Sequence, residues 1–154
     1  MIKNKNVLLN LHKTYVKDSE CKATVQDKVI FLCHLTFRVQ KELKLCAKVY
    51  IKTRMIKHLY DKKPAQEYDF IIKNLHTMVK YPDKIYNNRD SKTGDYCFTK
   101  LMGGVNYLVS LEVEKQFDGL DDVLFIVTSF QLKKENYITK YDLLWSWKGG
   151  ESSS

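Results

Sequence analysis

The segment from Asp95 to Glu114 carries the strongest structural signal of the sequence, that of a β-hairpin. It reads DYCFTKLM, then Gly103-Gly104, then VNYLVSLEVE, so apolar and polar residues alternate on both sides of a two-residue turn. Glycine readily adopts the positive φ that such turns require. The turn fixes the register of the two strands. The expected cross-strand pairs are Met102 with Val105, Lys100 with Tyr107, and Phe98 with Val109.

The residues before the hairpin predict helices. TVQDKVIFLCHLTFRVQKELK reads as a helix with Thr24 as its N-cap, although β-branched and aromatic residues leave a strand open for part of it. After a short strand, CAKVYI, Thr53 caps the helix TRMIKHLYDKK, which stops before Pro64. AQEYDFIIKNLHTMVKY is the clearest amphipathic helix, and Pro82 ends it.

Further strands follow the hairpin. GLDDVLFIVTSFQL predicts one strand. The tail YITKYDLLWSWKGG is either a helix or a strand, and as a strand it places on one face Tyr141, Leu143, Trp145 and Trp147. We therefore predict an α+β fold, in which N-terminal helices pack on a C-terminal antiparallel β-sheet.

Length and charge limit the class of protein. The 154 residues suit one domain, and no apolar run approaches the ~20 residues of a membrane span. The N-terminus does not resemble a signal peptide, so we expect a cytoplasmic protein whose four scattered cysteines are reduced. The net charge of +8 favours a polyanionic partner, either nucleic acid or an anionic membrane surface.

Lys100 is the first candidate functional residue, because the hairpin register places it in an otherwise apolar row with Phe98 and Tyr107. An ammonium group is costly to bury without a partner. Either the side chain reaches water at the sheet edge, or it lines a concave site where it meets a phosphate.

Thr128 and Ser129 are adjacent hydroxyl residues that close an apolar strand. Because neighbouring residues of a strand point to opposite faces, one of the two hydroxyls lies on the core face whichever face that is. Threonine is a common strand residue, so ordinary strand chemistry remains an alternative to phosphate binding.

His58 follows Arg54 by four residues on a predicted helix, so both side chains project from one face beside Lys57. A histidine near cations suits a general acid or base at neutral pH, and an exposed helical histidine is the alternative. Arg89 and Lys92 form a basic loop before the hairpin, and Trp145 and Trp147 either stack on bases or belong to the core.

Several motifs are absent from the sequence. It contains no Walker, Rossmann, HExxH or GxSxG motif, and no close carboxylate cluster that would hold Mg²⁺. We therefore expect no metal and no cofactor, and a nuclease with this sequence would have to work without metal.

The order of the motifs RMIKHLY, VKYPDKIYNN, YCFTK, VNYLVSLEV and FIVTSF resembles the barnase/EndoU/colicin/RelE-type ribonuclease superfamily, specifically its phage-associated branch. The resemblance covers about residues 47–148. It implies a ribonuclease-like α+β domain at 47–150 and leaves an N-terminal helical extension at 1–46. The composition of GGESSS separately predicts a flexible tail at 151–154. The resemblance also implies RNA, such as tRNA, as substrate, a toxin or phage-effector role, and a cognate inhibitor protein as a partner.

The resemblance also implies a mechanism, in which the RNA 2′-hydroxyl attacks the neighbouring phosphate to give a 2′,3′-cyclic phosphate. The implied catalytic residues are His58 as acid or base, Lys100 as the cation at the phosphorane, and Thr128 and Ser129 as hydrogen-bond donors. The implied backbone-binding residues are Arg54, Lys57, Arg89 and Lys92. No second histidine is apparent, so the leaving-group acid is unassigned.

Two other functions fit the same sequence. The basic sheet would look the same in a non-catalytic RNA- or DNA-binding module, and convergence of His58 and Lys100 on one phosphate position separates the two. An interaction protein of a mobile element is the third possibility, and it predicts no cleft over the sheet.

Overall fold

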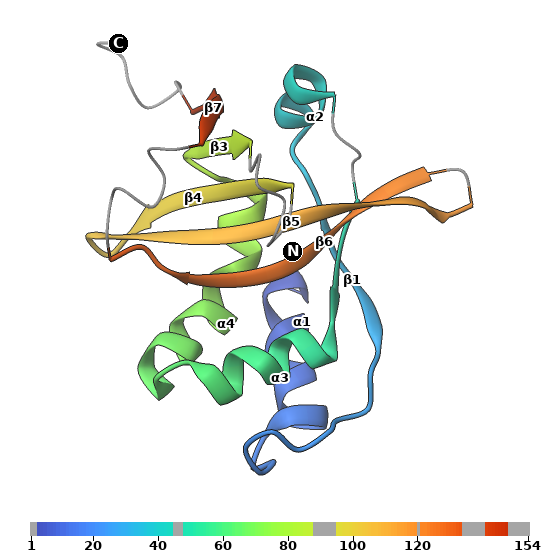
Figure 1. Ribbon diagram of the computed structural model, residues 1–154, viewed down its shortest axis with the longest axis vertical. Helices are drawn as coiled ribbons and strands as arrows, with labels where there is room; N and C mark the ends of the chain where they lie inside the picture. The colour runs from blue at the N-terminus through green and yellow to red at the C-terminus, as the bar shows by residue number, and fades with distance from the viewer. Residues whose placement is uncertain (1–2, 45–47, 88–94, 120, 134–140, 148–154) are drawn as a thin grey trace.

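The computed structural model describes residues 3–44, 48–87, 95–119, 121–133 and 141–147. The protein has an α+β fold built on one seven-stranded sheet with the strand order β1-β2-β6-β5-β4-β3-β7 (Figure 1). The strands are β1 (Val29–His34), β2 (Lys48–Lys52), β3 (Lys84–Asn87), β4 (Tyr96–Met102), β5 (Val105–Asp118), β6 (Asp121–Gln131) and β7 (Asp142–Ser146). The helices are α1 (Lys3–Leu11), the π-helix η1 (His12–Val16), α2 (Phe37–Leu43), α3 (Thr53–Lys62) and α4 (Ala65–Lys80).

The β4–β5 hairpin has the predicted register. Met102 pairs with Val105, Lys100 with Tyr107, and Phe98 with Val109. Gly103 and Gly104 form the turn with φ of 61° and 80°, values that favour glycine. The hairpin prediction is therefore confirmed.

The sheet is mixed rather than antiparallel as predicted, because β2 and β6 run parallel to each other. All other neighbouring strands are antiparallel. Parallel neighbours need a long crossover instead of a hairpin, and here α3, α4 and the β3–β5 strands lie between the two in the chain. No local pattern in either strand reveals such a distant pairing.

Within residues 24–44, the helical interpretation fails at Val29–His34, where the strand that the sequence left open is formed instead. Val29–His34 forms strand β1, which pairs with β2 and buries Leu32 and Cys33. The helix α2 begins only at Phe37, where the Thr36 side chain accepts a hydrogen bond of 3.4 Å from the Val39 N–H. The local pattern of this apolar run is ambiguous, and its pairing with β2 decides that it forms a strand.

The two later helices are confirmed, but Thr53 does not cap α3. It is the first residue of α3, fully buried, and its hydroxyl donates to the Gln26 carbonyl at 2.6 Å. The same oxygen accepts from the Lys28 N–H at 2.7 Å. The hydroxyl therefore fixes the incoming loop to the helix instead of satisfying the helix terminus.

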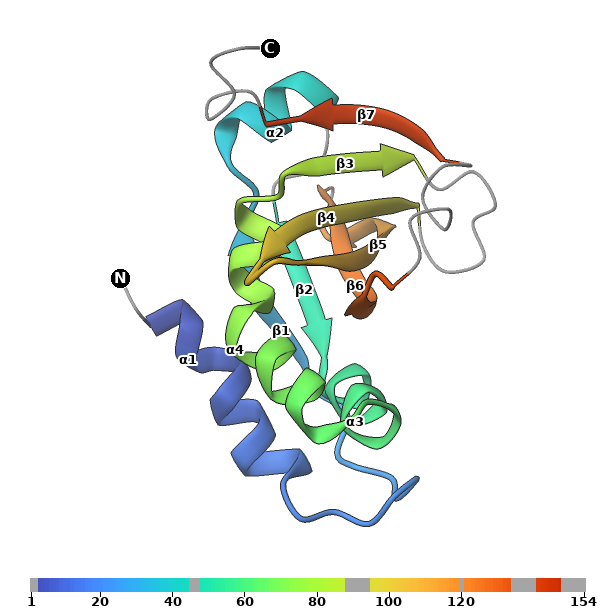
Figure 2. The ribbon, with the colours of Figure 1, turned by 90° about the vertical axis from the view of Figure 1, so that its left-hand side faces the viewer.

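Residues on both sides of position 46 share one hydrophobic core. Leu8 of α1 and Leu32 of β1 belong to the same buried cluster as Leu75 of α4 and Phe98 of β4. In Figure 2, α1 lies alongside α4, in agreement with the contacts between these helices. The extension expected at residues 1–46 thus contributes a strand and core side chains to the same sheet domain.

The segment YITKYDLLWSWKGG, predicted as either a helix or a strand, contains strand β7. Its predicted single face is wrong, because a register shift falls between the pairs Ile85–Trp145 and Tyr86–Leu143. Trp145 is buried at 8% exposure, whereas Leu143 is 52% exposed.

The described cysteines are free thiols, Cys21 on the surface and Cys33 and Cys97 in the interior. Burial raises the pKa of Cys33 to about 12 and that of Cys97 to about 11, so both thiols stay protonated at neutral pH. Within the described part of the chain, no helix has both the length and the apolar character needed to cross a membrane.

Candidate functional site

Lys100 contacts the C-terminal end of α4. Its Nζ donates a hydrogen bond of 2.7 Å to the carbonyl of Tyr81, the residue that follows α4, and lies 3.6 Å from Asp83 Oδ1. A cation is stabilised at this end of a helix, where carbonyl groups carry partial negative charge. The unusual lysine of the hairpin therefore has a partner, and its side chain is still 20% exposed.

Lys100 also lines a cavity of about 370 Å³, which we call the tryptophan cavity. The start of α2, the end of α4 and the ends of β4 and β7 meet there, and Figure 2 shows α2 beside β7. The lining residues are Thr36, Arg38, Lys80, Tyr81, Pro82, Asp83, Lys100, Trp145 and Trp147.

Asp83 holds one wall of the tryptophan cavity in place. Its carboxylate accepts from the Leu101 N–H at 2.7 Å, and its N–H donates to the Thr99 carbonyl at 2.8 Å. Its own carbonyl accepts from the Trp147 N–H at 2.7 Å. These three hydrogen bonds tie the end of β4 to the residue after β7, so Lys100 and Trp147 reach the same cavity.

Glu42 holds the opposite wall. Its Oε2 accepts a hydrogen bond of 2.7 Å from Trp145 Nε1 and lies 3.4 Å from Arg38 Nε. The Arg38 guanidinium lies 5.3 Å from the centroid of the Trp147 ring, within cation–π range. Trp145 is thus a buried anchor, while Trp147 is 43% exposed.

The lining of the tryptophan cavity is cationic and aromatic. Arg38, Lys80 and Lys100 face a single lining carboxylate, that of Asp83. Within the described part of the chain, Lys80 has no carboxylate at ion-pair distance, and its Nζ lies 5.9 Å from the Tyr81 ring. Tyr81 is 55% exposed. Such a site suits an aromatic ring that carries a phosphate, and its described lining offers no histidine for proton transfer.

The candidate site residues on α3 do not line the tryptophan cavity. His58 is exposed, and so is Arg54, whose Nε lies 3.9 Å from Asp27 Oδ2. Lys57 is only 4% exposed, and its Nζ donates to the Glu20 carbonyl at 2.7 Å. The Lys57 ammonium is therefore bound by interior acceptors and does not present a free charge at the surface.

His58 and Lys100 are not brought together. The contacts of Lys100 are at the C-terminal end of α4, whereas α3 precedes the N-terminal end of α4 and lies at that end in both views (Figures 1 and 2). The 16 residues of α4 span about 24 Å at a rise of about 1.5 Å per residue.

Ser129 is fully buried, and its hydroxyl donates to the Leu108 carbonyl at 2.8 Å. Thr128 is half-buried on the opposite face, across from Ser110 of β5. The two hydroxyls therefore do not act together on one ligand. The predicted basic loop residues Arg89 and Lys92 lie outside the described residues.

Removing the Ser129 hydroxyl is expected to lower the stability of the protein. Ser129→Ala removes a buried hydrogen bond to the Leu108 carbonyl, so the free energy of unfolding falls by about 1 kcal/mol. Thr128→Val, which deletes the half-buried hydroxyl, changes it by less than about 0.5 kcal/mol. Urea unfolding measures both. Unchanged stability of Ser129→Ala together with a loss of RNA cleavage would contradict the structural role.

Sequence reasoning missed Arg38, Lys80 and Glu42 as site residues. Arg38 lies inside the segment that reads as one long helix, and Lys80 is one of 23 lysines with no distinguishing neighbour. The pair Trp145 and Trp147 was the available signal, but nothing local in the sequence identifies the residues that they contact.

No protein-family model, no curated protein and no solved structure matches the chain.

Proposed function

We propose that the protein binds single-stranded nucleic acid, with RNA as the preferred partner, through the tryptophan cavity. The observation that supports this is the convergence of Arg38, Lys80 and Lys100 with the exposed rings of Tyr81 and Trp147 in one cavity. Stacking rings bind the bases and cations bind the phosphates of an extended strand.

A single strand fits the cavity better than a duplex. A base that lies on Trp147 has to leave its own stack, which is unfavourable in a duplex and nearly free in a single strand. The Arg38 guanidinium, already beside the Trp147 ring, adds to the stacking. The phosphate then faces Lys80 and Lys100, and the net charge of +8 attracts the strand at long range.

Intrinsic fluorescence provides the test, because Trp145 and Trp147 are the two tryptophans of the chain and both line the cavity. We expect titration with a 12-nucleotide oligouridylate to quench the emission, and the affinity to fall steeply with salt. Anisotropy of a labelled oligonucleotide measures the variants. Trp147→Leu loses one stacked base, so its affinity falls by about 5- to 150-fold.

Charge variants separate the cavity from the general basic surface. Lys80→Gln reduces the salt dependence of binding by about one phosphate contact. Lys115→Gln, which removes the same charge from the exposed part of β5, has a smaller effect. Equal losses in both variants, or binding that survives Trp147→Leu unchanged, would refute this site.

RNA cleavage remains a prediction of the resemblance. We do not propose it for the tryptophan cavity, because His58 and Ser129 do not line that cavity. Incubation of the same oligonucleotide in EDTA tests it, and we expect intact RNA. Cleavage with 2′,3′-cyclic phosphate ends that is lost in His58→Ala would make the protein a ribonuclease.

A further inference from the structure

A second cavity, of about 640 Å³, lies where α1, η1 and the residues after η1 meet α3 and the start of α4. Its polar and aromatic lining includes His12, Tyr60, Asp61, Lys63, Tyr68 and Asp69, and Leu9 and Ile72 add apolar surface. We call it the tyrosine cavity. Its volume falls within the range of about 300–1,000 Å³ that is usual for small-molecule sites.

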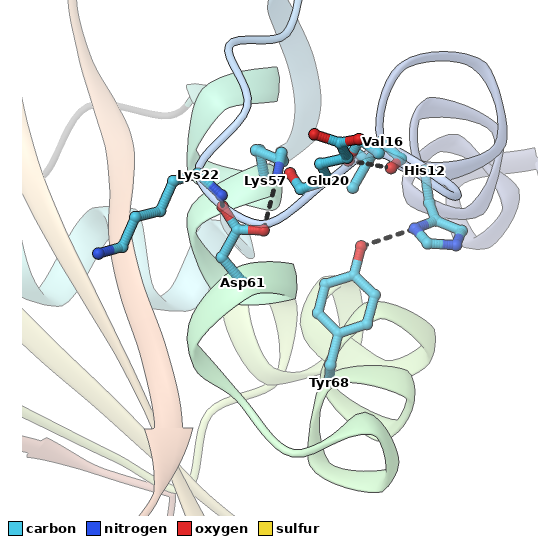
Figure 3. Close-up of polar contacts among 8 residues, drawn as sticks. His12, Val16, Glu20, Lys22, Lys57, Asp61 and Tyr68 are labelled. Carbon is cyan, nitrogen blue, oxygen red and sulfur yellow. Dashed lines mark hydrogen bonds and ion pairs between the residues drawn. The ribbon is translucent and has the colours of Figure 1, made fainter.

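Three rings form one wall of the tyrosine cavity. The ring centroids of His12, Tyr60 and Tyr68 lie 5.3 to 5.6 Å from one another. His12 Nδ1 is 2.8 Å from the Tyr68 hydroxyl, and Figure 3 shows this bond between η1 and α4. His12 is the first residue of the π-helix η1, a type of turn found frequently at functional sites.

Burial decides the protonation of this wall. It raises the pKa of Tyr68, so the phenol keeps its proton at neutral pH. Burial, followed by the charge of Lys17, lowers the pKa of His12, so the imidazole is neutral. A neutral imidazole has one donor and one acceptor nitrogen, so whichever role Nδ1 takes toward the Tyr68 hydroxyl, Nε2 takes the other and can bind a ligand.

The carboxylates that line the cavity are already occupied. Asp61 accepts from the buried Lys57 Nζ and, at 3.0 Å, from the Lys22 N–H (Figure 3). Asp69 is paired with Lys73 at 2.9 Å.

Lys63 differs from these groups. Within the described part of the chain no carboxylate lies at ion-pair distance from it, and its Nζ is 5.2 Å from the Phe130 ring. Two further lining groups can still hydrogen-bond a ligand, His12 Nε2 and the Tyr60 hydroxyl. The cavity thus offers one positive charge and two hydrogen-bonding groups beside an aromatic and apolar wall.

We propose that the tyrosine cavity binds a small aromatic anion, whose ring packs on the wall and whose phosphate or carboxylate group is bound by Lys63. The proposal does not rest on nucleic-acid binding, because it concerns different residues from the tryptophan cavity. A free nucleotide and an aromatic carboxylate share this chemistry, and the test separates them.

NMR of the full chain tests the proposal through the His12 ring protons. We expect uridine 5′-monophosphate or benzoate to shift them in a saturable way, and the ligand that does so identifies the anionic group. Uridine, which lacks the charge, and inorganic phosphate, which lacks the ring, bind at least about tenfold more weakly. The same shifts in Trp147→Leu exclude transmission from the tryptophan cavity.

Two neighbouring lysines provide the matched variants. Lys63→Gln weakens the binding by about tenfold or more, because it removes the charged donor. Lys62→Gln, at the exposed next position, changes it by less than about twofold. No saturable shift of His12 with either anion at 10 mM, or equal effects of the two substitutions, would overturn the proposal.

Discussion

Asp61→Asn is expected to lower the free energy of unfolding by about 3 kcal/mol. Asp61 forms an ion pair with Lys57 in which both side chains are nearly inaccessible, at 11% and 6% exposure. Removing one charge leaves a buried ammonium with only the Glu20 carbonyl as a strong acceptor. The loss of this pair also weakens the attachment of residues 20–22 to α3, because Asp61 accepts from the Lys22 N–H.

The pH dependence of this effect has a definite sign. The hydrogen bond from Lys57 lowers the pKa of Asp61 in the folded protein. A carboxyl group with a depressed folded pKa stabilises the protein above its unfolded pKa of about 3.9, and the contribution disappears as the pH falls through the folded value. The difference between parent and variant should therefore be constant from pH 5 to 8 and shrink below about pH 4.

Asp69→Asn is the matched control for this prediction. Asp69 pairs with Lys73 at the same helical spacing, but with side-chain exposures of 59% and 55%. Because water screens such a pair, its loss costs less than about 0.5 kcal/mol. Urea unfolding of both variants between pH 3 and 8 makes the comparison. Equal losses of unfolding free energy at pH 7 would show that burial does not strengthen the Lys57–Asp61 pair.

Phe98→Ala is expected to have the largest effect of any variant considered, about 3 to 5 kcal/mol. Phe98 is 1% exposed, lies opposite Val109 in the hairpin and belongs to the main core cluster. Truncation removes the transfer free energy of the ring and leaves a cavity that the rigid sheet cannot close.

Chemical denaturation also measures this prediction, and two variants sharpen it. Phe98→Leu keeps most of the volume, so it should cost less than half as much. Leu101→Ala, on the same strand but 55% exposed, should change stability by less than about 0.5 kcal/mol. A Phe98→Ala cost as small as that of Leu101→Ala would place Phe98 outside the core.

The fold was predictable from sequence where the signals are local. The Gly103-Gly104 turn determines its hairpin because both positive φ values lie within two residues. α4 was predictable because its buried residues repeat at the helical period. The strand β1 was not, because the crowded apolar residues of VIFLCH follow neither period and its partner β2 lies beyond α2. The parallel β2–β6 pairing has no local signal at all.

The candidate site was predictable only in part, for the same reason. The alternating pattern marks Lys100 as unusual. The structure explains why a lysine is tolerated there, because folding brings its ammonium to the C-terminal end of α4. Ser129 and Lys57 have residue types that suit phosphate binding, yet both donate to interior acceptors. Residue type indicates what a side chain is able to do, whereas burial decides whether a ligand reaches it.

The hydrogen bond from Trp145 to Glu42 joins residues 103 positions apart. Closing so long a loop costs entropy before any contact compensates it, so we expect this wall to form late in folding. A nascent chain that ends before β7 already carries Arg38, Lys80 and Lys100 but lacks both tryptophans. Under the proposed function, a growing chain at this stage would have the cations of the site but not its stacking ring, so we expect it to bind RNA more weakly than the finished protein.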